Sequence, residues 1–174
     1  LNDEWLRRID QIADDLANTP DRTLREAMQH ATVLREAGRR EETIGVLHAW
    51  LEQQQDAQDL TEQAIQVARF LGASDRFWEA KALLDGYRDK QDATTMEVDA
   101  ALGEMLHAIG SCDQALPYLV SVGETTGSLA MRMRAADCLL RLRRLDEAED
   151  VIAALQIDYP DDYQMAMLVA GLHR

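Results

Sequence analysis

Residues 145–155 read LDEAEDVIAAL, and this stretch decides the fold. The small residue Ala148 is followed four positions later by Ile152, and three positions after that by Leu155. Offsets of three and four residues bring side chains onto one face of an α-helix. The stretch therefore predicts a helix that buries this face against a neighbour.

Three earlier stretches share the pattern of a small residue, an apolar residue four positions on and another three positions later. They read REETIGVLHAW (40–50), FWEAKALLDGY (77–87) and CDQALPYLVSV (112–122). The small positions of the four copies, Thr43, Ala80, Ala115 and Ala148, are separated by 37, 35 and 33 residues. Such a period is typical of an array of structural repeats.

A second helix is predicted upstream of each copy. Twelve residues before each small position lies another small residue: Ala31, Ala68, Gly103 and Ala136. Three residues after each of these comes a leucine: Leu34, Leu71, Leu106 and Leu139. Thr23 with Glu26 has the Ser/Thr-x-x-Glu form that caps a helix start, and Asp59 with Glu62 approximates it. Each repeat is thus expected to be two antiparallel helices with a short connection.

The repeats predict a single array over residues 1–174. Its full repeats are expected at residues 24–60, 61–95, 96–128 and 129–162. Residues 1–20 are expected to form the second helix of a preceding repeat, and residues 163–174 the first helix of a following one. Because both ends fall within a repeat, we expect the chain to be a segment of a longer protein.

Composition favours an all-α protein and disfavours several classes of partner. The 174 residues include only three prolines and nine glycines, and aromatic residues make up 5%, so sheet-forming chemistry is scarce. A net charge of −14 would repel a phosphate backbone, so we expect no nucleic-acid partner. No apolar run approaches the roughly 18 to 20 residues that span a bilayer, so we expect no membrane insertion by this segment.

A repeat of this length, with small residues where two antiparallel helices cross, resembles the tetratricopeptide repeat (TPR) family. In the best-matching fourth copy, the family's small, large and proline positions hold Ala136, Leu139, Ala148, Ile152, Leu155 and Pro160. Thr43, Trp50 and Tyr87 depart from that pattern in earlier copies. The resemblance implies an all-α, right-handed superhelical solenoid of antiparallel helix pairs.

The resemblance also implies a non-catalytic scaffold that binds an extended peptide or short helix of another protein in a concave groove. In such proteins the upstream helix of each pair lines the groove. Carried over by position, the groove residues are Arg35, Gln66, Arg69, Glu104, His107, Met133, Arg134, Asp137 and Arg141. Some family members clamp a terminal carboxylate, but the matching positions here hold Met28, Thr32 and Gln66, so that activity is not carried over.

Two arginines are candidates for an acidic ligand group. Arg134 and Arg141 are seven residues apart, two turns along one helix face, and guanidinium forks suit carboxylates. Arg143 and Arg144 fall at the helix end and are expected to be solvated. Two alternatives to peptide binding stay open: a groove for an acidic polysaccharide, and a structural array with weak self-association through its terminal helices.

Motifs for catalysis or metal binding are lacking in the sequence. The four histidines, His30, His48, His107 and His173, are scattered, without the spacing of a zinc site. Cys112 and Cys138 are too distant for a Cys-x-x-Cys motif; we interpret them as free thiols, with a disulfide as the alternative. No phosphate-binding loop or nucleophile elbow occurs. We therefore expect no enzyme activity, no metal and no cofactor.

The ratio of arginine to lysine indicates the kind of organism that encodes the chain. Sixteen arginines against two lysines indicate a GC-rich bacterial genome. Bacterial proteins that resemble this chain include scaffolds of secretion and exopolysaccharide export, so we expect a role of this kind. Cytoplasmic and periplasmic locations both stay open, as does the identity of the partner.

Overall fold

The computed structural model describes residues 3–17, 22–54, 58–88, 95–160 and 168–170. Within these ranges the regular elements are all helices. They are α1 (Asp3–Ala17), α2 (Leu24–Glu36), α3 (Arg40–Gln53), α4 (Leu60–Ala73), α5 (Phe77–Arg88), α6 (Thr95–Ala108), α7 (Cys112–Thr126), α8 (Leu129–Arg141) and α9 (Leu145–Asp158). The all-α prediction is confirmed.

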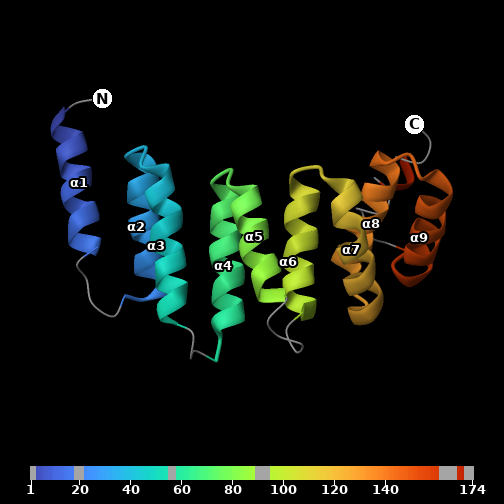
Figure 1. Ribbon diagram of the computed structural model, residues 1–174. Helices are drawn as coiled ribbons and strands as arrows, with labels where there is room; N and C mark the ends of the chain where they lie inside the picture. Colours follow the sequence, from blue (N-terminus) through green and yellow to red (C-terminus); the bar gives the residue numbers. More distant parts are fainter. Residues whose placement is uncertain (1–2, 18–21, 55–57, 89–94, 161–167, 171–174) are drawn as a thin grey trace. The chain divides into compact units, whose positions relative to one another are not determined.

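The chain forms two compact units, Leu1–Leu83 and Leu84–Arg174, and the boundary falls inside α5. In the first unit α1 packs on α2, α2 on α3 and α3 on α4, and α2 also contacts α4. In the second unit α6, α7, α8 and α9 pack consecutively, and α6 also contacts α8 (Figure 1). In each unit, therefore, the first helices of successive hairpins also contact each other: α2 contacts α4, and α6 contacts α8.

Helix starts follow the predicted caps in part. The Thr23 hydroxyl accepts from the Glu26 backbone N–H, and the Glu26 carboxylate accepts from the Thr23 N–H at 2.8 Å. Ser128 caps α8 by accepting from the Met131 N–H. Asp59 precedes α4 but makes no side-chain cap. The box at Thr23 is confirmed, and the approximate one at Asp59 is wrong.

The four hairpin turns share one backbone conformation. Gly38 and Gly110 have φ of 78° and 80°, and Asp75 and Arg143 adopt 60° at the matching positions. A non-glycine residue in this left-handed region costs roughly 1 kcal/mol. In each hairpin the next backbone N–H donates, at 2.9 Å, to the carbonyl of a predicted leucine, namely Leu34, Leu71, Leu106 or Leu139. These bonds end the upstream helices shortly after the predicted leucines.

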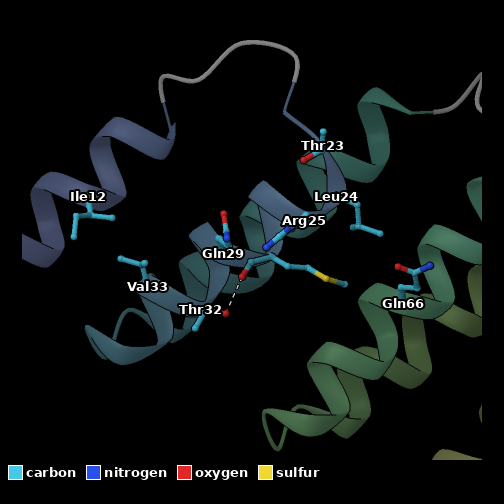
Figure 2. Close-up of a pocket in the computed structure, with 9 residues that line it drawn as sticks. Ile12, Thr23, Leu24, Arg25, Gln29, Thr32, Val33 and Gln66 are labelled. Carbon is cyan, nitrogen blue, oxygen red and sulfur yellow. Dashed lines mark hydrogen bonds between the residues drawn. The ribbon is translucent and has the colours of Figure 1, made fainter.

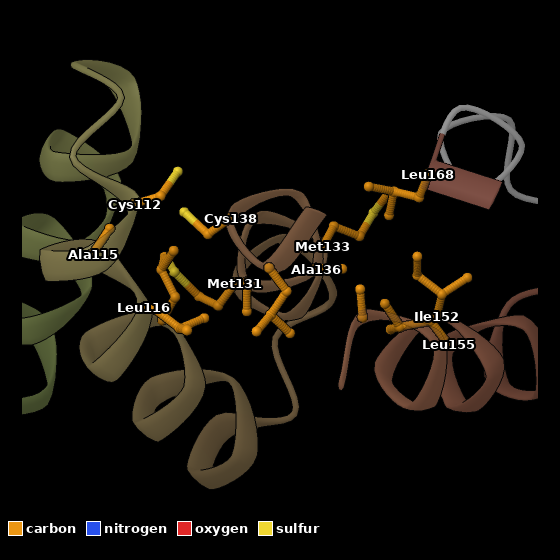
Figure 3. Close-up of a cluster of buried hydrophobic side chains, with 14 of the residues drawn as sticks. Cys112, Ala115, Leu116, Met131, Met133, Ala136, Cys138, Ile152, Leu155 and Leu168 are labelled. Atoms are coloured by element: carbon orange, nitrogen blue, oxygen red, sulfur yellow. The ribbon is translucent and has the colours of Figure 1, made fainter. Parts of the chain in front are cut away.

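The predicted small positions lie where helices cross. Ala31, Ala136 and Ala148 are fully buried, as the pattern predicts. In the second unit the core is continuous from α7 through α8 to α9, with Met131, Met133 and Cys138 among its members (Figure 3). Side chains of α8 thus fill the space between its two neighbouring helices, as expected for a repeat whose core forms only between neighbours.

Hydrogen bonds explain why the first repeat tolerates two residues, Thr43 and Trp50, that depart from the TPR sequence pattern. Thr43 replaces an alanine, and its hydroxyl lies 3.2 Å from the Arg39 carbonyl and 3.4 Å from that of Ala31. Trp50 is 3% exposed, and its indole N–H donates to the Arg22 carbonyl at 2.7 Å. Both polar groups are therefore satisfied inside the core, which is the condition for burying them without a large cost.

Candidate functional site

A cavity of about 890 Å³ opens along α2 in the first unit (Figure 2). Its lining is mostly apolar. The lining residues are Ile12 from α1, Thr23, Leu24, Arg25, Met28, Gln29, Thr32 and Val33 from the start and body of α2, and Gln66 from α4. A cavity of this size falls within the usual range of ligand pockets.

The sequence of α2 separates a core face from a pocket face. Ala27, Ala31 and Leu34 are buried on the core face. Leu24 and Met28 follow each other by four residues on the other side, so they project together into the cavity. The Thr32 hydroxyl donates to the Met28 carbonyl at 2.8 Å and is satisfied within the helix. The pocket face therefore presents carbon surface with few groups that need water.

Ile12 adds an apolar side chain from the facing helix. It is 45% exposed, although isoleucine is among the residues most often buried. Figure 2 shows Ile12 and Val33 on opposite sides of the opening, from α1 and α2 respectively. An exposed aliphatic side chain beside an apolar cavity indicates a surface suited to an apolar ligand group.

Arg25 supplies charge beside this apolar surface. It lines the pocket, is exposed, and makes no ion pair or hydrogen bond with any residue that the structure describes. The Gln66 side-chain amide donates to Glu62 at 3.4 Å, and Gln29 of α2 is an exposed residue of the same lining. The site thus combines a hydrophobic recess, an uncompensated guanidinium and amide groups able to bind a peptide backbone.

The predicted groove residues of the first unit are only partly gathered at this pocket. Gln66 lines it. Arg35 instead donates to the Ser74 hydroxyl at 2.9 Å and lies over the Phe70 ring, 5.8 Å from its centroid. It lines a second cavity of about 470 Å³ near the hairpin turns. Arg69 is exposed on α4 outside both linings.

The predicted groove residues of the second unit form a polar seam where α6 contacts α8. Glu104 Oε1 lies 3.5 Å from Arg134 Nη1. His107 Nε2 lies 2.8 Å from Asp137 Oδ2, and Arg141 Nε donates to the same oxygen at 2.9 Å. We call these five residues the α6–α8 seam.

The ion pairs of the seam make Arg134 and Arg141 weaker candidates for binding an acidic ligand. Arg134 and Arg141 already face carboxylates of the chain itself, so an acidic ligand would have to replace Glu104 and Asp137. Met133, predicted to face a groove, is 9% exposed and belongs to the hydrophobic core beside Leu168 (Figure 3). The sequence placed the seam residues together, but it could not show that they pair with each other.

Sequence reasoning missed most of the pocket lining. It named Met28 and Thr32 only as departures from a carboxylate clamp, and it did not name Arg25 or Ile12. A signal was available, because Leu24 and Met28 lie four residues apart on the face of α2 that flanks the predicted core face. What the sequence could not supply was the facing surface, which comes from α1 and α4.

Over the ranges that the structure describes, no group of three or more histidine, cysteine, aspartate or glutamate side chains is arranged to hold a metal ion. None of the described helices combines the length and the apolar character that crossing a bilayer requires.

Antiparallel helix hairpins with small residues at their crossings, repeated along the chain, define a helical-repeat protein. Residues 106–172 match the model of the tetratricopeptide repeat family. The resemblance predicted from the sequence is confirmed, by family for these residues and by fold for the chain.

Three solved structures share this fold. A variant of MamA covers 99% of this chain and 88% of its own length, at 21% identity and a TM-score of 0.59. Another structure of MamA covers 95% and 81%, at 21% identity and a TM-score of 0.61. YrrB, described as a TPR protein with an unusual peptide-binding site, covers 83% and 75%, at 20% identity and a TM-score of 0.55. No curated protein matches the chain.

Proposed function

We propose that this chain is a non-catalytic protein-interaction scaffold, and that the pocket along α2 binds a peptide segment of a partner protein. The observation that carries the proposal is the apolar cavity of about 890 Å³, whose lining includes Arg25, an arginine with no ion pair or hydrogen bond to the described part of the chain. Three lining residues, Met28, Thr32 and Gln66, stand at the positions where other family members hold a peptide carboxylate. The chemistry here differs, because these side chains carry no charge.

The lining indicates the kind of peptide. Leu24, Met28 and Ile12 favour one large apolar side chain, and the flexible thioether of Met28 can adapt to its shape. Arg25 favours a carboxylate next to that side chain. A peptide with an aspartate or glutamate beside a leucine, isoleucine, methionine or phenylalanine fits both features.

The pocket can be tested with peptides selected from a random display library on the immobilised chain. We expect the selected peptides to share an apolar residue with an adjacent acidic one. Met28→Glu should weaken their binding at least tenfold, about 1.4 kcal/mol, because a carboxylate would be desolvated against the apolar anchor. Met96→Glu is the matched control, since Met96 is 41% exposed on α6 and lies outside the lining.

A second pair of variants separates charge from apolar contact. Arg25→Ala should weaken binding about five- to tenfold and remove the preference for the acidic residue. Arg143→Ala, at an exposed arginine in a hairpin turn of the second unit, should leave the affinity unchanged. Selected peptides that bind Met28→Glu as tightly as the original chain would rule out this pocket as the site.

The two alternatives predicted from the sequence receive less support. An acidic polysaccharide on the α6–α8 seam would have to displace the internal ion pairs of Arg134 and Arg141. Self-association through the terminal helices rests partly on Met165 and Met167, which lie outside the described residues; Leu168, which is described, is 9% exposed and belongs to the core cluster. A role in bacterial secretion or exopolysaccharide export stays a prediction from the resemblance.

A further inference from the structure

The two cysteines of the chain meet inside the second unit. Cys112 is the first residue of α7, and Cys138 lies in α8. Both are buried free thiols, 3% and 0% exposed, and both belong to the hydrophobic core. Figure 3 shows their two sulfur atoms next to each other between α7 and α8, and Cys112 contributes to the raised pKa of Cys138. Two neighbouring thiols on packed helices are close enough to react with each other as well as to fill the core.

We propose that Cys112 and Cys138 form a reversible intramolecular disulfide when the folded protein meets a small disulfide oxidant of the glutathione class. One cysteine thiolate attacks a sulfur of the oxidant, a mixed disulfide forms, and one glutathione thiolate leaves. The second cysteine thiolate then attacks the protein sulfur of that mixed disulfide, and the second glutathione thiolate leaves. The two cysteine protons pass through solvent to the departing thiolates, so one disulfide replaces another.

The order of attack follows from the positions of the two residues. Cys112 lies at the start of α7, and the preceding Ser111 makes no side-chain cap, so an opening of this first turn would expose the Cys112 sulfur. Cys138 lies in the interior of α8. Burial, followed by the contact with Cys112, raises the pKa of Cys138, so its thiol stays protonated while the pair is closed. Cys112 therefore meets the oxidant first and Cys138 resolves the mixed disulfide, on a timescale of minutes to hours.

The cross-link would fix one helix crossing. It would join the second helix of one hairpin, α7, to the first helix of the next, α8. Asp137, the neighbour of Cys138, holds His107 and Arg141 in the α6–α8 seam, so the crossing that is fixed lies beside this polar surface. The two cysteines are 26 residues apart in the chain, a loop long enough for a cross-link to restrict the unfolded state strongly.

The test uses the folded chain and oxidised glutathione as the probe. After incubation, remaining thiols are blocked with N-ethylmaleimide in denaturant, and the intact mass and proteolytic peptides are measured. We expect the loss of two hydrogen atoms, no maleimide label, and one peptide that joins Cys112 to Cys138. The melting temperature should rise by roughly 5–15 °C and return to the starting value after reduction with dithiothreitol.

Two controls make the result decisive. Cys112→Ser should gain no internal cross-link and should show no rise in melting temperature under the same treatment. Unfolded wild-type chain, oxidised in urea, shows that the oxidant is active and marks the cross-linked mass. The proposal is overturned if the folded chain keeps both thiols while the unfolded chain oxidises. It is equally overturned if the disulfides join two different chains.

Discussion

His30 shows how a single buried side chain ties stability to pH. The ring is 4% exposed, and its Nδ1 lies 3.0 Å from Nη1 of Arg22. A guanidinium only donates, so Nδ1 must accept and the ring must be neutral. Burial is the largest effect that lowers the pKa of His30; the charges of Arg22 and Arg39 add to it, and Glu42 and Asp14 oppose it.

The sign of the pH dependence follows from this lowered pKa. Below about pH 6.5 the unfolded chain takes up a proton on His30 that the folded chain resists, so acid favours unfolding. The stabilisation is fully present above pH 6.5 and is lost as the pH falls toward the folded pKa, by at most about 1.4 kcal/mol per pH unit. We therefore expect wild type to lose more stability than His30→Gln between pH 7.5 and 5.5, by up to about 1 kcal/mol.

Urea unfolding followed by tryptophan fluorescence measures this difference. All three tryptophans lie in the first unit, as does His30, so the signal reports the unit concerned. Carboxylates titrate in both proteins and cancel in the comparison. Equal losses of stability in the two proteins would show that His30 is not held neutral by the fold.

At the scale of elements, the crossing of α6 and α7 depends on a glycine. A Cβ at Gly103 would lie 3.0 Å from Leu119 Cδ2 and 3.2 Å from Tyr118 Cβ. Leu119 is fully buried among other core side chains, and the Tyr118 atom is a Cβ held close to the backbone. Gly45, in the middle of α3, would place a Cβ in open space. Alanine substitution at both glycines therefore separates the effect of close packing, present only at Gly103, from the effect of helix propensity, present at both.

Alanine at both glycines should gain up to about 1 kcal/mol from helix propensity. In Gly103→Ala this gain should be exceeded by overpacking, which typically costs 1–3 kcal/mol, for a net loss of about 1 kcal/mol. Gly45→Ala should keep the gain, at about 0.5–1 kcal/mol. Thermal unfolding by circular dichroism measures both, and stabilisation of both variants alike would show that the α6–α7 crossing has room for a methyl group.

The helices and their pairing were predictable because their determinants are local and repeated. The small residues at each crossing, the leucine three positions later and the short turns all lie within one repeat, and their periodicity recurs four times. Interactions between distant residues were not predictable. Trp50 was recognised as a departure, but its partner, the Arg22 carbonyl, lies 28 residues away and has no sequence signature.

The candidate site was predictable only where its chemistry lies on one helix. The spacing of Arg134 and Arg141 predicted a shared face of α8, and in the structure Arg141 pairs with Asp137 one turn earlier on this helix. Their pairing with α6 was not visible, because Glu104 and His107 meet them across a contact between helices whose registry depends on core packing. The pocket was missed for a similar reason, since residues of α1, α2 and α4 together line it.

At the scale of the molecule, stability should follow from contacts between sequence neighbours. Helices α6 to α9 form one unit and α1 to α4 lie in the other. In repeat arrays each element contacts only nearby elements, so total stability approximates a sum of local terms. A defect in one unit is then expected to open that unit preferentially.

Leu119→Ala tests this expectation. Leu119 is a fully buried side chain of α7, and its truncation should cost about 2–5 kcal/mol through lost contacts and a cavity. Hydrogen exchange measured by mass spectrometry should show faster exchange in α6, α7 and α8, because these amides open by local unfolding of the weakened unit. Protection of α2 and α3 should stay within error of wild type. If α2 and α3 lost protection to the same extent, opening would be a single cooperative event, and local additivity would not describe this chain.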